Sequence, residues 1–168
     1  MHVYDESSTR RKRVSAYVNW SRELTFSDRQ INCIRDNVPE ARGVYAVYAK
    51  DHLFPYSSVL NSTRRWSSLI YIGCGQLSKR LTCHLARKKN DVLEEYLRQY
   101  DLAYRYALIV DNLDNDWSRV VEASLLHLFS EKFGMLPPAN RRRETVPELG
   151  LHTLYLRGSM NFSVLRRG

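Results

Sequence analysis

The chain has 168 residues, and its 26 lysines and arginines against 18 aspartates and glutamates give it a net charge of +8. A hydrophobic content of 43% excludes a disordered chain, and the length favours one compact domain whose charge suits a polyanionic partner, although a basic protein without such a partner has a similar composition. Three cysteines without a CxxC pair exclude a disulfide framework, and the lack of a membrane-length apolar run or apolar N-terminal core predicts a cytoplasmic protein, or a nuclear one if the source is eukaryotic.

The first 42 residues are expected to form an addition to the main domain. Residues 1–13 are polar and should form a mobile basic arm that follows a phosphate backbone, with a solvated tail and a nuclear import signal as the alternatives. The arm ends in four consecutive cations, namely Arg10, Arg11, Lys12 and Arg13. Ser27 and Gln30 have the spacing of a capping box, which predicts a helix that ends before Pro39 and packs on the core.

Two short β-prone runs follow, at residues 43–49 and 69–73. The residues between them, 50–67, are too many for a simple hairpin and are interpreted as an inserted loop. The loop contains a cationic and aromatic cluster formed by Arg64, Arg65 and Trp66. This cluster either contacts phosphates and stacks on a base, or places its tryptophan on the core.

A leucine repeat predicts an amphipathic helix over residues 76–88. Arg80 and His84 are four positions apart on it, so they should lie one turn apart on a single face. Asn90 is expected to cap a further helix that reaches Gln99. Residues 103–110 then predict a third strand.

The helix expected over residues 116–132 has one polar residue within its apolar arc, Glu122. A carboxylate placed there needs an arginine partner, a proton or a metal ion, because an unpaired buried charge is too costly. Two prolines, Pro137 and Pro138, end the helical region ahead of Asn140. A last β-prone run at 151–156 offers a fourth strand. Three arginines follow Asn140 directly and are expected to contact the backbone of a nucleic acid, namely Arg141, Arg142 and Arg143.

In this order the residues resemble the GIY-YIG nuclease family over about residues 43–140. Gly43-Val44-Tyr45 matches the first signature and Tyr71-Ile72-Gly73 the second. Arg80 with His84 matches the family's Arg-x3-His/Tyr helix. The separation from Tyr71 is one position short, which makes Lys79 an alternative, but the retained spacing to His84 favours Arg80. The family's metal-binding glutamate and its downstream asparagine correspond to Glu122 and Asn140.

The resemblance implies single-metal phosphodiester hydrolysis. Glu122 would hold one Mg²⁺ or Mn²⁺ ion, and Arg80 would neutralise charge on the phosphorus in the transition state. Tyr45 would orient or deprotonate the attacking water, the latter only with help from the metal or Arg80 because a phenol has a pKa near 10. Tyr71 would hydrogen-bond the phosphate or the water, and His84 would act beside it as a donor or proton relay.

Asn140 is expected to fix the local architecture through its amide rather than to take part in the chemistry. The sequence therefore predicts an α/β fold with a small, mostly antiparallel three-stranded sheet flanked by helices. Its parts are an N-terminal addition (1–42), a nuclease core (43–140) and a basic C-terminal extension (141–168).

The predicted function is a metal-dependent endonuclease acting on DNA, most simply duplex DNA, as a stand-alone restriction-type or phage-type enzyme. A homodimer would let a single catalytic domain cut both strands. The alternative is a catalytically silent nucleic-acid-binding module on the same fold, against which the presence of both Glu122 and Arg80 argues.

Overall fold

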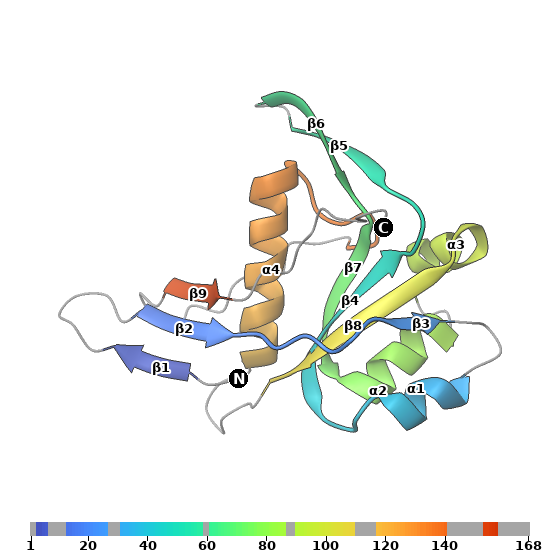
Figure 1. Cartoon of the computed structure of the whole chain (residues 1–168), viewed down its shortest axis with the longest axis horizontal. Coiled ribbons are helices and arrows are strands. Elements are labelled where there is room, and N and C mark those ends of the chain that lie inside the picture. Colours follow the sequence, from blue (N-terminus) through green and yellow to red (C-terminus); the bar gives the residue numbers. More distant parts are fainter. Residues whose placement is uncertain are drawn as a thin grey trace.

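The computed structural model describes seven stretches of the chain. These are residues 3–6, 13–26, 31–58, 61–86, 90–109, 117–140 and 153–157. Their centre is a four-stranded antiparallel sheet in the order β3-β8-β4-β7 (Figure 1). Its strands are β3 (Leu24–Phe26), β4 (Arg42–Ala49), β7 (Leu69–Gln76) and β8 (Leu102–Leu108). The three expected strands and the mixed α/β class are confirmed, whereas the short β3 was not predicted.

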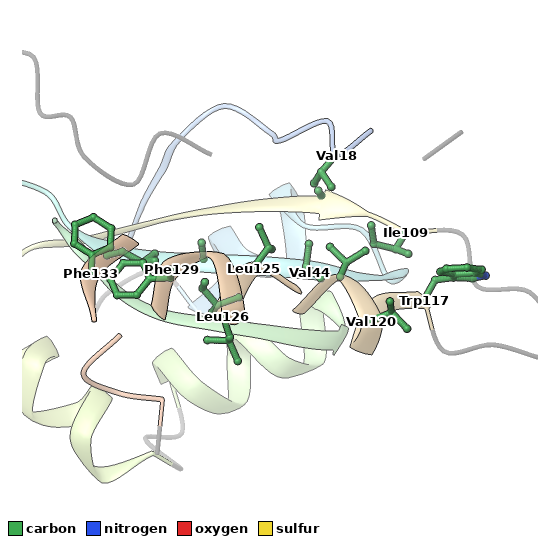
Figure 2. Close-up of a cluster of buried hydrophobic side chains, with 14 of the residues drawn as sticks. Val18, Val44, Ile109, Trp117, Val120, Leu125, Leu126, Phe129 and Phe133 are labelled. Carbon is green, nitrogen blue, oxygen red and sulfur yellow. The ribbon is translucent and has the colours of Figure 1, made fainter. Parts of the chain in front are cut away.

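Strand β4 lies in the interior of the sheet and sends alternate residues into two separate cores. Val44 and Ala46 face α4 (Trp117–Phe133), whose apolar side covers one face of the sheet (Figure 2). Tyr45 and Val47 face the opposite core. Because successive strand residues point to opposite faces, one short segment supplies both cores.

The helices of the second core are α1 (Ile31–Asn37), α2 (Leu77–Leu81), the π-helical turn η1 (Thr82–Ala86) and α3 (Asp91–Gln99). Helix α1 ends before Pro39 and buries Ile34 in this core, as predicted for the helix of this region. The Asn90 side chain accepts a hydrogen bond from the amide of Leu93 at 3.0 Å and caps α3, as predicted. The capping-box residues 27–30 lie outside the described parts of the chain.

The interpretation of residues 50–67 as a loop is wrong. They contain a β-hairpin, β5 (Phe54–Ser58) paired with β6 (Asn61–Ser67), that projects beyond the sheet (Figure 1). Buried Tyr56 holds the hairpin on α4, with its ring 5.3 Å from Phe129 and 5.1 Å from Phe133 between centroids. Because this packing partner comes from a distant part of the sequence, the serines and the proline of the segment itself do not predict the hairpin.

The ends of the chain form a second sheet beside α4 (Figure 1). Strand β1 (Val3–Glu6) pairs antiparallel with β2 (Arg13–Tyr17), and β2 pairs in parallel with β9 (Thr153–Arg157). The expectation that residues 151–156 extend the central sheet is therefore wrong. The prediction of a mobile arm is also wrong for β1 and Arg13, which take part in this sheet. The other cations of the arm, Arg10, Arg11 and Lys12, lie outside the described residues.

No helix in the described parts of the chain is both long enough and apolar enough to cross a bilayer.

Candidate active site

Two tyrosines from neighbouring strands form the floor of the site. Tyr45 on β4 and Tyr71 on β7 have ring centroids 5.9 Å apart and belong to the same core. Tyr45 is paired with Gly73 and Val47 with Tyr71, so the regular alternation of the two strands places both tyrosine rings on one face of the sheet. The register shifts between Val47 and Tyr48, where Ile70 has no paired residue on β4, and Ile70 enters the same core as its neighbour Tyr71, as expected at a β-bulge.

Gly73 is required by the approach of these two rings. It is paired with Tyr45, and a Cβ atom on it would lie 2.6 Å from the Tyr45 hydroxyl oxygen and 2.7 Å from Cε1 of Tyr71. Such distances are far below van der Waals contact. The final glycine of the second triplet therefore leaves the space that the tyrosines occupy.

Helix α2 begins directly after β7 and brings Arg80 to the tyrosines. Gly75 adopts a positive φ of 123°, and a Cβ there would lie 3.2 Å from Cγ of Arg80, so the arginine stem lies over the glycine backbone. Burial raises the pKa of both tyrosines, and the positive charge of Arg80 partly opposes this rise. Lys79, the alternative to Arg80, lines a cavity together with Arg35. Of these two cations, Arg80 is therefore the one that lies beside the tyrosines.

His84 reaches the same cluster from η1, at the point where the α-helix widens into a π-helical turn. Its ring lies 5.2 Å from that of Tyr71 and 6.3 Å from that of Tyr45 between centroids. The imidazole is buried, and its Nδ1 atom forms no hydrogen bond within the described structure. Burial, assisted by the nearby charge of Arg80, lowers the pKa of His84 to about 4, so the ring is neutral at physiological pH.

Glu122 approaches from α4, which packs along the edge strand β7. Its side chain is buried, as the apolar arc of the helix predicts. The negative charge of Glu122 contributes to raising the pKa of Tyr71 and, more weakly, of Tyr45. The carboxylate and the tyrosines therefore belong to one electrostatic cluster.

Both site tyrosines are neutral phenols near neutral pH. Burial, followed by the proximity of Tyr71, raises the pKa of Tyr45 well above its usual value near 10. Burial and then Glu122 raise the pKa of Tyr71 in the same direction. The Tyr45 hydroxyl is buried and has no hydrogen-bond partner of normal geometry in the described residues. Its environment favours hydrogen bonding by the intact phenol over deprotonation.

Asn140 holds the edge of the sheet beside the site. Its Oδ1 accepts a hydrogen bond from the amide of Ile72 at 2.9 Å, and its Nδ2 donates to the Ile72 carbonyl at 2.7 Å. One side-chain amide thus satisfies both backbone groups of a residue between Tyr71 and Gly73. Through these two hydrogen bonds Asn140 positions the strand that carries Tyr71.

Removing that amide should destabilise the protein. We expect Asn140→Ala to lower the free energy of unfolding by about 2 kcal/mol, because two part-buried backbone groups lose their partners. Urea denaturation measures the change, with the exposed Gln99→Ala at the end of α3 as a control that should stay within about 0.5 kcal/mol of the wild type. Equal stability of the two variants would contradict the role assigned to the asparagine.

His84 should make stability depend on pH. Its folded-state pKa of about 4 is below the ordinary value of 6.5, so the unfolded chain binds a proton more readily between these values. The stabilisation is complete above pH 6.5 and is lost as the pH falls towards 4. We expect this loss to reach on the order of 2 kcal/mol after screening by solvent. Urea unfolding at pH 7 and pH 5 should show a smaller difference for His84→Gln than for the wild type.

The buried carboxylate suits a hard divalent cation. Within the described residues no three His, Cys, Asp or Glu side chains gather into a group that could hold a metal ion. Mg²⁺ and Mn²⁺ do not need such a cage, because Mg²⁺ is commonly held by one or two carboxylates, retained waters and substrate phosphate. Glu122 fits this kind of site as its one protein ligand.

The hairpin residues expected to contact nucleic acid divide into two roles. Arg65 donates a hydrogen bond to the carbonyl of Lys132, so it binds the carboxyl end of α4 instead of projecting freely. Trp66 is 47% exposed, which contradicts the alternative that it folds onto the core and leaves base stacking as a prediction. The Arg64 side chain and residues 141–143 lie outside what the structure describes.

Two features of the site escaped sequence reasoning. Gly75, which accommodates the stem of Arg80, is signalled only by the closely spaced glycines of Gly73-Cys74-Gly75. The bulge at Ile70 has no sequence signal, because residues 69–72 are uniformly apolar or aromatic.

Comparisons of the chain with models of protein families, with curated proteins and with solved structures find no match. The interpretation of the site therefore rests on its own residues and geometry.

Proposed function

We propose that the chain is a metal-dependent endonuclease of the GIY-YIG type that hydrolyses phosphodiester bonds in DNA. The observation that carries the proposal is the convergence of five side chains from five elements on one small region. The five are Tyr45, Tyr71, Arg80, His84 and Glu122. Core packing alone does not need a cation, a carboxylate and an orphaned imidazole nitrogen beside two phenols.

Arg80 is the residue that binds the scissile phosphate. Arg80 is exposed to solvent, yet its charge acts on both buried tyrosines. The side chain therefore lies between solvent and the two phenols. A guanidinium offers a planar set of donors that matches phosphate oxygens. Arg80 would bind the phosphate and stabilise the extra negative charge of the transition state.

The tyrosines would position water and substrate. As neutral phenols they donate and accept hydrogen bonds, so Tyr45 orients the attacking water and Tyr71 holds the water or a phosphate oxygen. Neutral His84, with its unused Nδ1, can relay a proton beside Tyr71. Glu122 would hold Mg²⁺ or Mn²⁺, which supplies polarisation of the phosphate and stabilisation of the leaving oxygen.

The first experiment is incubation of the protein with supercoiled plasmid in Mg²⁺, in Mn²⁺ and in a chelator. Conversion to nicked or linear plasmid in either metal but not in the chelator supports the proposal. Plasmid that is bound but not cut in either metal would contradict the nuclease proposal and support a catalytically silent nucleic-acid-binding module.

A conservative substitution tests the role of the guanidinium. We expect Arg80→Lys to lower the rate of cleavage about 10²-fold, because the charge remains but the paired donors are lost. The matched control is Arg105→Lys, which alters an exposed arginine that pairs with Glu23 on the surface. Equal rates for the two variants would remove Arg80 from the proposed chemistry.

A further inference from the structure

A cavity with polar and charged lining residues lies beside α2, where it is lined by Lys79, the neighbour of Arg80. It has a volume of about 290 Å³ and lies between α1 and the α2–η1 helix. Arg35 and Lys79 line it with exposed side chains, and the buried residues Ser78 and Thr82 line it with hydroxyl groups. Glu40 is the one carboxylate in the lining.

Neither Arg35 nor Lys79 forms an ion pair with a carboxylate of the described residues. Cations that converge on a polar concavity with hydroxyl donors present the groups that proteins use to bind phosphate oxygens. A cationic ligand would need a lining with more carboxylates than Glu40.

The position of the cavity relative to Arg80 limits what its ligand can be. Lys79 and Arg80 are consecutive on α2, so their Cα atoms are about 3.8 Å apart and their side chains diverge by about 100°. Successive phosphates of one DNA strand rise by about 3.4 Å along the helix axis. Long side chains that diverge from adjacent positions of α2 reach groups separated by more than this rise, so Arg80 and the cavity can hold phosphates one or two nucleotides apart on one strand.

We propose that this cavity binds a backbone phosphate of the cleaved strand, one or two nucleotides from the scissile phosphate held by Arg80. This inference rests on the proposed function and names a subsite of it. Arg35 and Lys79 bind the phosphate oxygens, and the Ser78 and Thr82 hydroxyls donate to them from the wall of the cavity. The contact fixes the register of the strand and carries no base specificity.

The test is the salt dependence of duplex binding, measured by fluorescence anisotropy of a labelled DNA in chelator so that no cutting occurs. We expect the double variant Arg35→Ala/Lys79→Ala to bind roughly tenfold more weakly near 0.1 M salt. Its log–log slope against salt should be smaller by about 0.9, since the variant loses one phosphate contact. Thermal melting by circular dichroism establishes that the variant is folded.

The matched control, Arg22→Ala/Lys50→Ala, removes two exposed charges that do not line the cavity. It should change the slope by less than half as much. A cavity variant with the slope of this control would overturn the inference and leave the nuclease proposal intact, provided that the wild type cuts plasmid. Wild-type protein that neither binds duplex nor cuts plasmid would overturn both.

Discussion

Glu122→Gln should abolish plasmid cleavage, with a loss of at least about 10⁴-fold in rate. Glutamine has the same shape but cannot supply the negative charge that holds a divalent cation. Loss of the metal's electrostatic contribution costs several kcal/mol in the transition state, and each 1.36 kcal/mol is a factor of ten. Because Glu122 is buried on α4, the isosteric change is preferable to alanine, which would also leave a cavity.

The same variant should remain folded and still bind DNA. The measurement is initial cleavage rate on supercoiled plasmid in Mg²⁺, with duplex affinity and thermal melting recorded for the same preparations. Glu131→Gln is the matched control, because Glu131 is on the same helix, is exposed and pairs only with His127 at 3.3 Å among the contacts described. Full activity of Glu122→Gln would sink the metal assignment even if the wild type proves to be a nuclease.

Gly73→Ala should damage both the fold and the activity. The added methyl group would lie 2.6 Å from the Cζ and hydroxyl oxygen of Tyr45, so the strands or the rings must separate. Overpacking of this kind costs about 3 kcal/mol in the free energy of unfolding. Displacement of the rings by about 1 Å should lower the cleavage rate of the folded protein by 10²-fold or more.

The control for this variant is Gly134→Ala, at the end of α4, where φ is 79°. It should cost about 1 kcal/mol of stability by backbone strain alone and leave the rate per folded molecule unchanged. Addition of Tyr45→Phe to Gly73→Ala should restore part of the stability, because the hydroxyl is one of the clashing atoms. Additive effects of these two substitutions would show that the clash is relieved elsewhere.

The proposed chemistry depends on charges that the fold keeps close and partly shielded. Arg80 and Glu122 act on the same tyrosines with opposite sign, so the pKa of each phenol responds to both. Bound phosphate and metal would enter between charges that are already fixed in position. Such preorganisation lowers the reorganisation needed during reaction.

The sequence alone predicted the elements whose signals are local. Hydrophobic alternation and periodicity located β4, β7, β8 and α4, and the cap at Asn90 located α3. The burial of Glu122 also followed from local information, because its angular position on the helix is fixed by the period of 3.6 residues. Local periodicity is sufficient for these features because each is set by neighbours within a few residues.

The tertiary structure decided the features that depend on distant partners. Hairpin β5–β6 packs through Tyr56 on α4, and β9 pairs with β2 near the other end of the chain, so neither follows from its own segment. The bulge at Ile70 brings that residue into the core of the tyrosines, and α2 places Arg80 beside the tyrosines but Lys79 in the lining of a cavity with Arg35. The neutral state of His84 likewise comes from burial and from the charge of Arg80. Sequence spacing identifies the candidate residues, but burial and cross-strand register determine which of them meet and in which protonation state.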